Sequence, residues 1–89
     1  MNDLSLEERK RKLFYRSTHR GCKETDILLG GFAGRYLPLL SAEKLEQYER
    51  IVELDDDLLY SYIVGSRLVP SSIDKELVAL IAAFAVDNK

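Results

Sequence analysis

The segment Arg20-Gly21-Cys22-Lys23-Glu24 combines residue types that suit recognition of another molecule. Glycine has no Cβ, so Gly21 allows a tight turn or the close approach of a second backbone. The charged side chains of Arg20 and Glu24 can make directional, charge-assisted hydrogen bonds to groups of a partner. These residue types predict a docking site on a protein surface rather than a catalytic centre.

A catalytic alternative comes from His19 and Cys22, the single histidine and the single cysteine of the chain. A histidine can activate a thiol as a nucleophile when a third group orients it. No such group is evident, and a small chain has little room for a cleft of a few hundred Å³. We interpret Cys22 as a packing or turn residue and expect no enzyme and no catalytic residues. A hydrolase that depends on these two residues would lose its activity on Cys22→Ser.

Two further segments raise the question of a cofactor or a metal ion. Gly30-Gly31-Phe32-Ala33-Gly34 lacks the G-x-G-x-x-G spacing and the preceding strand of a dinucleotide-binding site. Asp55-Asp56-Asp57 offers carboxylates, but no loop with EF-hand spacing surrounds them, and acids at the start of a helix oppose its dipole. We therefore expect no metal site, and no FAD or NAD bound by this chain alone.

The charges are segregated although the formal net charge is only −2. Seven Lys or Arg and no acids lie between Arg9 and Lys23, whereas Glu43–Asp57 holds seven acids and two bases. Two solvated helix faces would explain this pattern, as would a basic surface that steers an acidic partner or binds a polyanion such as RNA. Glu24 and Asp26 disfavour nucleic acid because carboxylates repel phosphates. If the first helix continued to Lys23, one positive stripe would hold Arg16, His19, Arg20 and Lys23.

Composition indicates one folded domain over residues 1–89. Apolar residues make up 46% of the chain and charged residues 31%, which favours a core over disorder. A single cysteine excludes an internal disulfide, and the apolar run Val78–Val86 is shorter than the ~20 residues that span a bilayer. The charged N-terminus has no signal-peptide or presequence features. We expect a cytoplasmic protein, monomeric when free and not inserted into membranes, with ends that fray at about residues 1–5 and 87–89.

Apolar residues recur at intervals of three and four, which predicts an all-α fold, a small five-helix bundle. The expected helices cover Ser5–Thr18, Lys23 or Glu24 to Leu37, Ala42–Leu54, Leu58–Val64, and a last segment introduced by Pro70-Ser71-Ser72. Ser5, Ser41 and Ser71 are the expected N-caps. Gly21 is expected to end the first helix, and Pro38 the second, because proline cannot donate to the i−4 carbonyl.

The expected second helix contains three glycines, Gly30, Gly31 and Gly34, each of which costs about 1 kcal/mol relative to alanine. They suggest that a neighbouring helix approaches closely; a helix broken near Gly30 is the alternative. The clearest amphipathic stripe is in the last helix. It consists of Leu77, Leu80, Ile81 and Phe84.

The stretch Leu13–Ala33 resembles the succinate dehydrogenase assembly factors that promote flavinylation, the SdhE-type family. The core of the match is the family's R-G-x-x-E motif, which falls on Arg20, Gly21 and Glu24. Similarity covers most of residues 9–84. It includes Tyr15-Arg16-Ser17, Asp26–Gly30, Leu45–Leu54 and Leu59–Gly65. Tyr62 stands where the family usually has a tryptophan, so the packing of that ring and its role in binding differ from the family pattern.

The resemblance implies a five-helix bundle with a chaperone-like role. Such proteins bind the flavoprotein subunit of succinate dehydrogenase or fumarate reductase and promote covalent attachment of FAD, the partner's cofactor, to a histidine of that subunit. With the motif as guide, the expected partner-binding residues are Arg16, His19, Arg20, Gly21, Glu24 and Asp26. The resemblance also implies a bacterial cytoplasmic protein. The alternative is a nucleic-acid-binding or antitoxin-like regulator that uses Arg9–Lys23, with an affinity that falls steeply with salt.

Overall fold

The computed structural model describes residues 5–87, and these form five α-helices and no strand. The predicted all-α, five-helix, single-domain fold is confirmed. Residues 1–4 and 88–89, which include most of the ends expected to fray, lie outside the described residues. The elements are α1 Leu6–Thr18, α2 Lys23–Tyr36, a 3₁₀ turn η1 Leu37–Leu39, α3 Ala42–Val52, α4 Asp56–Ile63 and α5 Lys75–Asp87.

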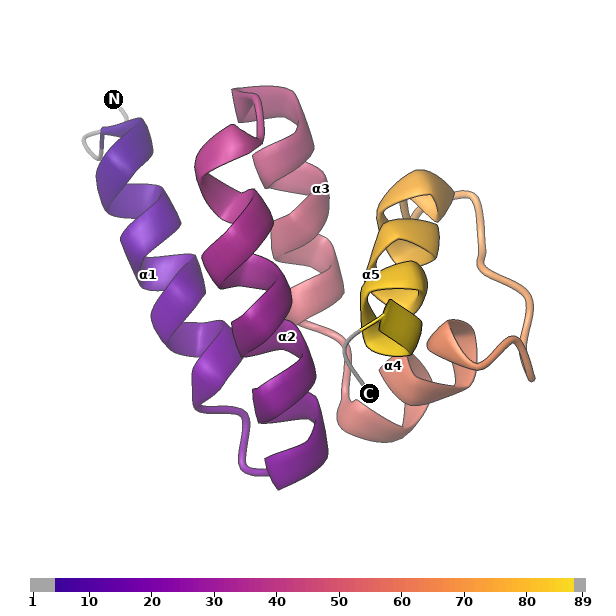
Figure 1. Ribbon diagram of the computed structural model, residues 1–89. Helices are drawn as coiled ribbons and strands as arrows, with labels where there is room; N and C mark the ends of the chain where they lie inside the picture. Colours follow the sequence, from indigo (N-terminus) through magenta and orange to yellow (C-terminus); the bar gives the residue numbers. More distant parts are fainter. Residues whose placement is uncertain (1–4, 88–89) are drawn as a thin grey trace.

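Helices α1 and α2 form an antiparallel hairpin, and α3 packs against α1 (Figure 1). Helices α4 and α5 lie together on the other side of α2, and α5 contacts α2. The turn between α1 and α2 and the turn between α3 and α4 lie at the same end of the molecule (Figure 1). This arrangement brings the Gly21 segment next to the start of α4.

The helix ends follow from short polar side chains. Ser5 and Glu8 make a reciprocal capping box, with Glu8 N donating to Ser5 Oγ at 3.2 Å and Ser5 N donating to Glu8 Oε1 at 3.3 Å. Ser41 accepts from Lys44 N, as expected for the N-cap of α3. The expected cap Ser71 is wrong for α5: Asp74 Oδ1 accepts from Glu76 N and Leu77 N instead, because α5 begins at Lys75.

Helix α2 is continuous through its glycines, so the broken-helix alternative is wrong. A Cβ on Gly30 would lie 2.8 Å from Thr18 Cγ2, and one on Gly31 would lie 3.0 Å from the Phe84 ring. These two glycines therefore let α1 and α5 approach α2 closely, as predicted. A Cβ on Gly34 would meet only Phe14, at an ordinary 3.7 Å.

The core lies where α2, α3 and α5 meet, around the fully buried rings of Phe32 and Tyr48. Phe32 contacts Tyr48 and Phe84 at ring-centroid distances of 5.9 and 6.1 Å. The predicted α5 stripe needs one correction: Leu80 is 44% exposed, whereas Val78 is buried. One helical turn presents several apolar residues, and only the position of α2 and α4 decides which of them are covered.

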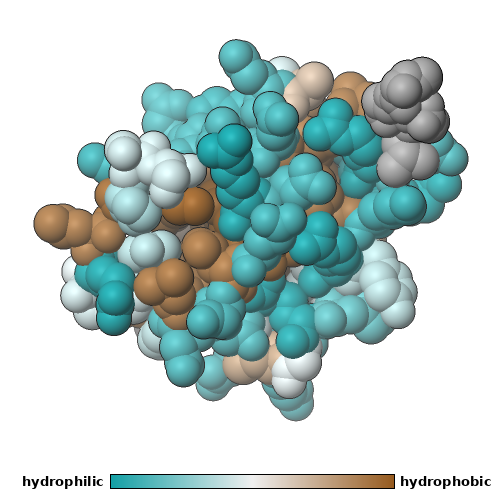
Figure 2. Space-filling view, turned by 180° about the vertical axis from the view of Figure 1, so that it is seen from behind, coloured by the Kyte–Doolittle hydropathy of each residue, from teal (hydrophilic) through white to brown (hydrophobic). Residues whose placement is uncertain are grey.

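The surface opposite to the view of Figure 1 is mainly hydrophilic, and its apolar side chains gather on the side of α4 and α5 (Figure 2). Val64 and Leu68, in and next to the α4–α5 connection, are among the exposed large apolar side chains. Within residues 5–87, none of the helices combines the length and apolar character needed to cross a bilayer.

Candidate functional site: the turn between α1 and α2

The chain turns sharply between Thr18, the last residue of α1, and Lys23, the first of α2. Gly21 lies exposed at this turn with φ of +99°, a left-handed conformation that favours glycine. Arg20 N donates to Asp26 Oδ1 at 2.6 Å, which holds the turn against the first helical turn of α2. We call residues 19–24 the docking corner. Because α1 ends before it, as expected, Arg16, His19, Arg20 and Lys23 do not form one helical stripe.

The Arg20 side chain points into the protein and is only 7% exposed. Its Nε donates to Asp56 Oδ1 at 2.8 Å, and its two Nη atoms donate to the carbonyl oxygens of Val52 and Leu54. The last carbonyls of a helix lack intrahelical partners, and a cation near them is favourable for the helix dipole. The expectation that the Arg20 charge bonds outward is therefore wrong, and its contact with a partner stays a prediction.

Asp56 joins the docking corner to α4. Its Oδ1 accepts from Arg20 Nε and, at 2.9 Å, from Thr25 Oγ1 of α2. The sequence indicated only that Asp56 starts a helix, which it does. Its second role, as the partner of Arg20, cannot be read from the acidic triplet alone. The pairing becomes evident only in the fold, which places α2 next to α4. Arg20 pairs with Asp56, so Glu24 is not its internal partner.

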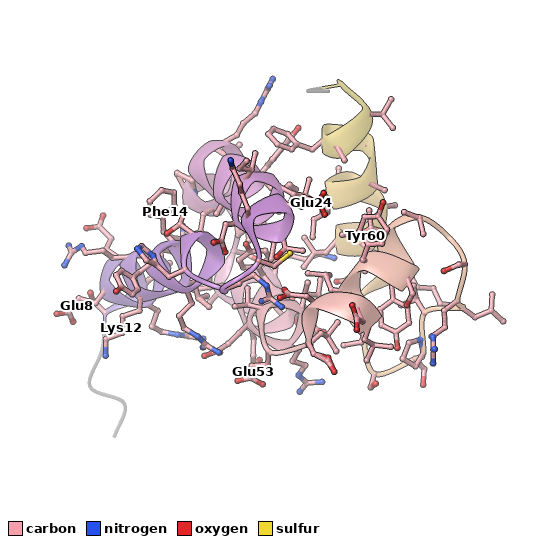
Figure 3. The ribbon with its side chains drawn as sticks, turned by 90° about the horizontal axis from the view of Figure 1, so that it is seen from below. Glu8, Lys12, Phe14, Glu24, Glu53 and Tyr60 are labelled. Carbon is pink, nitrogen blue, oxygen red and sulfur yellow. The ribbon has the colours of Figure 1, made fainter. Side chains whose placement is uncertain are left out.

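Glu24 is exposed, and its carboxylate makes no hydrogen bond or ion pair with the described residues. It lines a small hollow of about 160 Å³ together with Cys22, Asp57 and Tyr60. Figure 3, which views the corner end of the molecule, shows Glu24 of α2 near Tyr60 of α4. Tyr60 is 54% exposed. Sequence reasoning missed Asp57 and Tyr60 as neighbours of the docking corner, because α4 lies more than 30 residues further along the chain.

Arg16 and His19 lie on a different side of the turn from Glu24. They line a shallow hollow of about 390 Å³ with the ends of α3 and α4. The His19 ring stacks on Tyr15 with centroids 3.9 Å apart, and its Nδ1 lies 2.8 Å from the Tyr15 carbonyl oxygen. A carbonyl only accepts, so Nδ1 carries the proton in this contact. Arg16 approaches Glu53 at 4.0 Å.

The geometry offers no support for the catalytic alternative. In the described part of the chain, the contacts of His19 are with Tyr15 and Thr18, and no hydrogen bond joins it to Cys22. Among residues 5–87 there is also no group of three His, Cys, Asp or Glu side chains placed to hold a metal ion. Tyr62, the residue at the family's usual tryptophan position, is a buried core residue, so its ring serves packing.

The fold and the docking corner define a small all-helical protein whose most distinctive polar feature is an exposed turn held in place by internal hydrogen bonds. Residues 11–85 match the protein family described as "Flavinator of succinate dehydrogenase". The chain belongs to this family, and the resemblance predicted from the sequence is confirmed.

Three relatives illustrate the similarity. "Succinate dehydrogenase assembly factor 2, mitochondrial" of Komagataella phaffii is 35% identical over 89 residues, covering 96% of this chain and 47% of the relative. "FAD assembly factor SdhE" of Acetobacter pasteurianus is 39% identical over 66 residues, covering 74% of this chain and 61% of the relative. "Succinate dehydrogenase assembly factor 2-B, mitochondrial" of Drosophila mojavensis is 35% identical over 88 residues, covering 97% and 55%. The chain thus spans about half the length of the mitochondrial relatives from these two organisms.

Proposed function

We propose that this chain is an assembly factor that binds the flavoprotein subunit of succinate dehydrogenase, or of fumarate reductase, and promotes covalent attachment of its FAD. The observation that carries the proposal is the family match over residues 11–85, with the motif residues Gly21 and Glu24 exposed on a braced turn. FAD is then the partner's cofactor, and this chain acts as a chaperone without catalytic residues of its own.

The residues of the docking corner and their neighbours have different roles in this proposal. Gly21 lets a partner backbone approach, because no Cβ covers the turn. Glu24 offers an unpaired carboxylate to donors of the partner, and Arg16 and His19 extend the contact on the other side. Arg20 and Asp26 keep the corner in shape through internal bonds. Docking would favour a partner conformation in which the flavin and its histidine are aligned, so the acceleration comes from orientation.

A monomeric state when free and a bacterial cytoplasmic location belong to the same proposal. The Acetobacter relative supports a bacterial setting, whereas the Komagataella and Drosophila relatives are named as mitochondrial. The nucleic-acid alternative is disfavoured by the geometry of the basic segment. Arg20 is buried, and Arg9 and Arg16 each lie 4.0 Å from a glutamate in or just after α3, which leaves fewer cations for phosphates.

The test measures binding to the purified flavoprotein subunit and covalent flavin by in-gel fluorescence. Glu24→Ala and Gly21→Ala are expected to weaken binding by about tenfold or more, equivalent to at least ~1.4 kcal/mol. Two matched controls separate docking from folding. Gly65→Ala imposes a similar left-handed backbone cost, since Gly65 has φ of +82° and a Cβ there meets nothing within 4 Å. Glu46→Ala removes an exposed glutamate of α3.

Both controls are expected to bind and to support flavin attachment as the wild type does. Normal levels of covalent flavin with Gly21→Ala and Glu24→Ala would contradict the proposal. RNA or DNA binding that weakens steeply with salt would favour the nucleic-acid alternative instead.

A further inference from the structure

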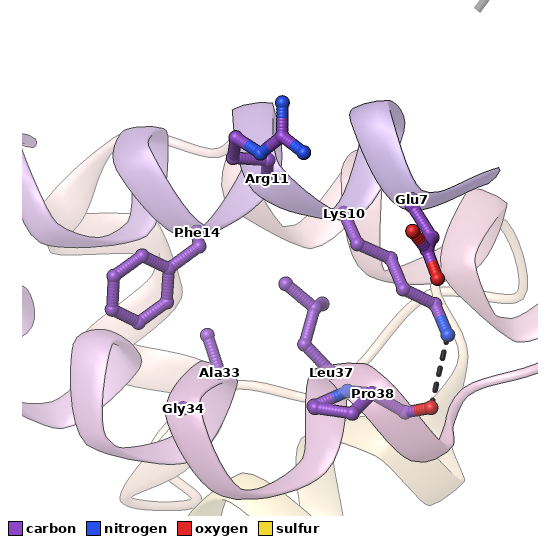
Figure 4. Close-up of a pocket in the computed structure, with 8 residues that line it drawn as sticks. All are labelled: Glu7, Lys10, Arg11, Phe14, Ala33, Gly34, Leu37 and Pro38. Atoms are coloured by element: carbon purple, nitrogen blue, oxygen red, sulfur yellow. Dashed lines mark hydrogen bonds between the residues drawn. The ribbon is translucent and has the colours of Figure 1, made fainter. Parts of the chain in front are cut away.

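A third recessed surface lies between α1 and the C-terminal part of α2, away from the hollow at Glu24. Its volume is about 560 Å³ (Figure 4). The floor is apolar and is formed by Ala33, Gly34, Leu37 and Pro38. Phe14 of α1 forms a wall and is 43% exposed, so part of its ring is accessible to a partner. We call this surface the α1–α2 groove.

Basic side chains lie along the α1 edge of the groove. Lys10 Nζ donates to the Pro38 carbonyl oxygen at 3.0 Å, so this cation is held across one end (Figure 4). Arg11, three residues before Phe14, also lies on the α1 edge of the groove. Its side chain makes no hydrogen bond or ion pair with the described residues. Glu7 is at the far end of the edge. The groove therefore combines an apolar floor and the exposed Phe14 ring with basic side chains on its α1 edge, where the Arg11 guanidinium lies on the side of α1 away from the floor (Figure 4).

Three arginines of the basic segment Arg9–Lys23 have acidic neighbours within the protein. Arg9 approaches Glu49 of α3, Arg16 approaches Glu53 just after α3, and Arg20 is buried against the start of α4. Of the remaining cations of α1, Lys10 and Arg11 line the α1–α2 groove, whereas Lys12 is exposed outside it. A groove of this kind is complementary to a peptide that carries an apolar side chain next to a carboxylate, because the ring buries the first and the guanidinium binds the second.

We propose that the α1–α2 groove binds an acidic segment of the flavoprotein partner, with an apolar side chain against Phe14 and an adjacent Asp or Glu bound to Arg11. The identity of the partner rests on the proposed function. Continuity with the docking corner supports a shared partner: Phe14 lies one helical turn before Thr18, about 6 Å along α1. One partner surface can therefore contact the corner and the groove together.

The test compares three variants in binding to the purified flavoprotein subunit. Arg11→Glu reverses the charge at the groove, and Gly34→Leu fills its floor from a position where an added Cβ meets only Phe14, at 3.7 Å. Lys12→Glu is the matched control, because it makes the same charge change at the next, exposed residue, which does not line the groove. Arg11→Glu and Gly34→Leu are each expected to lower the affinity about tenfold, and Lys12→Glu by less than about twofold.

A photo-crosslinking amino acid at position 11 supplies an independent readout. Crosslinks are expected to a flavoprotein segment in which an Asp or Glu neighbours an apolar residue. Wild-type affinity of both Arg11→Glu and Gly34→Leu would overturn the inference, as would an equal loss with Lys12→Glu, which indicates general charge attraction. If Glu24→Ala loses binding while the groove variants do not, the proposed function stands and only the groove inference fails. If the wild-type chain does not bind the flavoprotein subunit, both fail.

Discussion

The Arg20 side chain holds the docking corner in place through internal hydrogen bonds, while other residues of the corner stay exposed. Its guanidinium donates to a carboxylate and two carbonyl oxygens of the α3–α4 turn, and its backbone N–H donates to Asp26. A planar guanidinium with several donors suits this geometry in a way that the single ammonium group of lysine does not. The charge of Arg20 thus braces the docking corner, while Gly21 and Glu24 stay exposed.

Removal of this side chain is expected to destabilise the protein. Arg20→Ala removes one of the two donors to the Asp56 carboxylate and the side-chain donors to two carbonyl oxygens, and we expect a loss of roughly 2–3 kcal/mol in the free energy of unfolding. Urea denaturation followed by circular dichroism measures it. Arg67→Ala, at an exposed arginine, is the control and should change the free energy by less than about 0.5 kcal/mol. A similarly small change for Arg20→Ala would show that the internal bonds contribute little.

At the scale of the helices, the hairpin of α1 and α2 depends on a glycine rather than on a charged pair. Gly30 faces Thr18, whose hydroxyl bonds to the Tyr15 carbonyl oxygen and whose methyl group points at α2. The helix accepts the propensity cost of glycine because a Cβ would come within 2.8 Å of that methyl group. The crossing also fixes where the docking corner begins, since α1 ends at Thr18.

Gly30→Ala is expected to lower the free energy of unfolding by about 1 kcal/mol, because overpacking outweighs the gain in helix propensity. Thr18→Ser in the Gly30→Ala background removes the clashing methyl group and keeps the hydroxyl, so it should recover most of the loss. Gly34→Ala serves as the comparison and should be neutral or stabilising, by up to ~1 kcal/mol. The three variants are compared by thermal and urea denaturation. A stabilised Gly30→Ala single variant would contradict the close-packing account.

The start of α5 joins two elements through Asp74. Its Oδ1 caps α5, and its Oδ2 lies 2.7 Å from Lys44 Nζ of α3. The hydrogen bond with Lys44 lowers the pKa of the Asp74 carboxyl below its usual value, and the same pair, with Glu76, raises the pKa of Lys44. The contact between α3 and α5 is therefore partly electrostatic and depends on pH.

Because the folded-state pKa of Asp74 is depressed, its contribution is fully present above the unfolded-state pKa, near 4, and is lost as pH falls through the folded-state value. Asp74→Asn should therefore flatten the acid limb of a plot of unfolding free energy against pH. Asp74→Ala should cost about 1 kcal/mol at neutral pH through loss of the cap, whereas Ser71→Ala should be nearly neutral. An equal or larger effect of Ser71→Ala would restore Ser71 as the cap. Urea denaturation at pH 2 to 7 provides the measurement.

At the scale of the whole molecule, a buried polar contact joins α1 to α3 in the core. Ser17 Oγ donates to the Leu13 carbonyl oxygen at 2.7 Å, so the Tyr48 hydroxyl donates to Ser17 Oγ at 2.6 Å. Both side chains are fully buried. In the described part of the chain, no buried side-chain nitrogen or oxygen lacks a hydrogen-bond partner, so the core tolerates this polar contact.

Burial raises the pKa of Tyr48 to about 12, from an ordinary value near 10. A raised folded-state pKa means that this stability is fully present below pH 10 and is lost as pH rises toward 12, because the unfolded chain ionises first. The wild type should therefore lose roughly 2 kcal/mol relative to Tyr48→Phe over that interval. Urea denaturation between pH 9 and 12 tests this, with Tyr15→Phe, at an exposed tyrosine, as the control. Parallel pH profiles for all three proteins would refute the prediction.

Local features of the sequence determined the helices and the position of the docking corner. Periodicity, capping residues and Gly21 act over a few neighbours, so the elements and the left-handed turn were predictable, as was the family through its motif. The direction of Arg20, its pairing with Asp56, the cap at Asp74 and the exposure of Leu80 were not. These four features depend mostly on residues or helices that are distant in the chain, so local sequence patterns do not reveal them. Only the packing of the turn between α1 and α2 against the end of α3 and the start of α4 decided that the Arg20 charge is buried while Glu24 remains available to a partner.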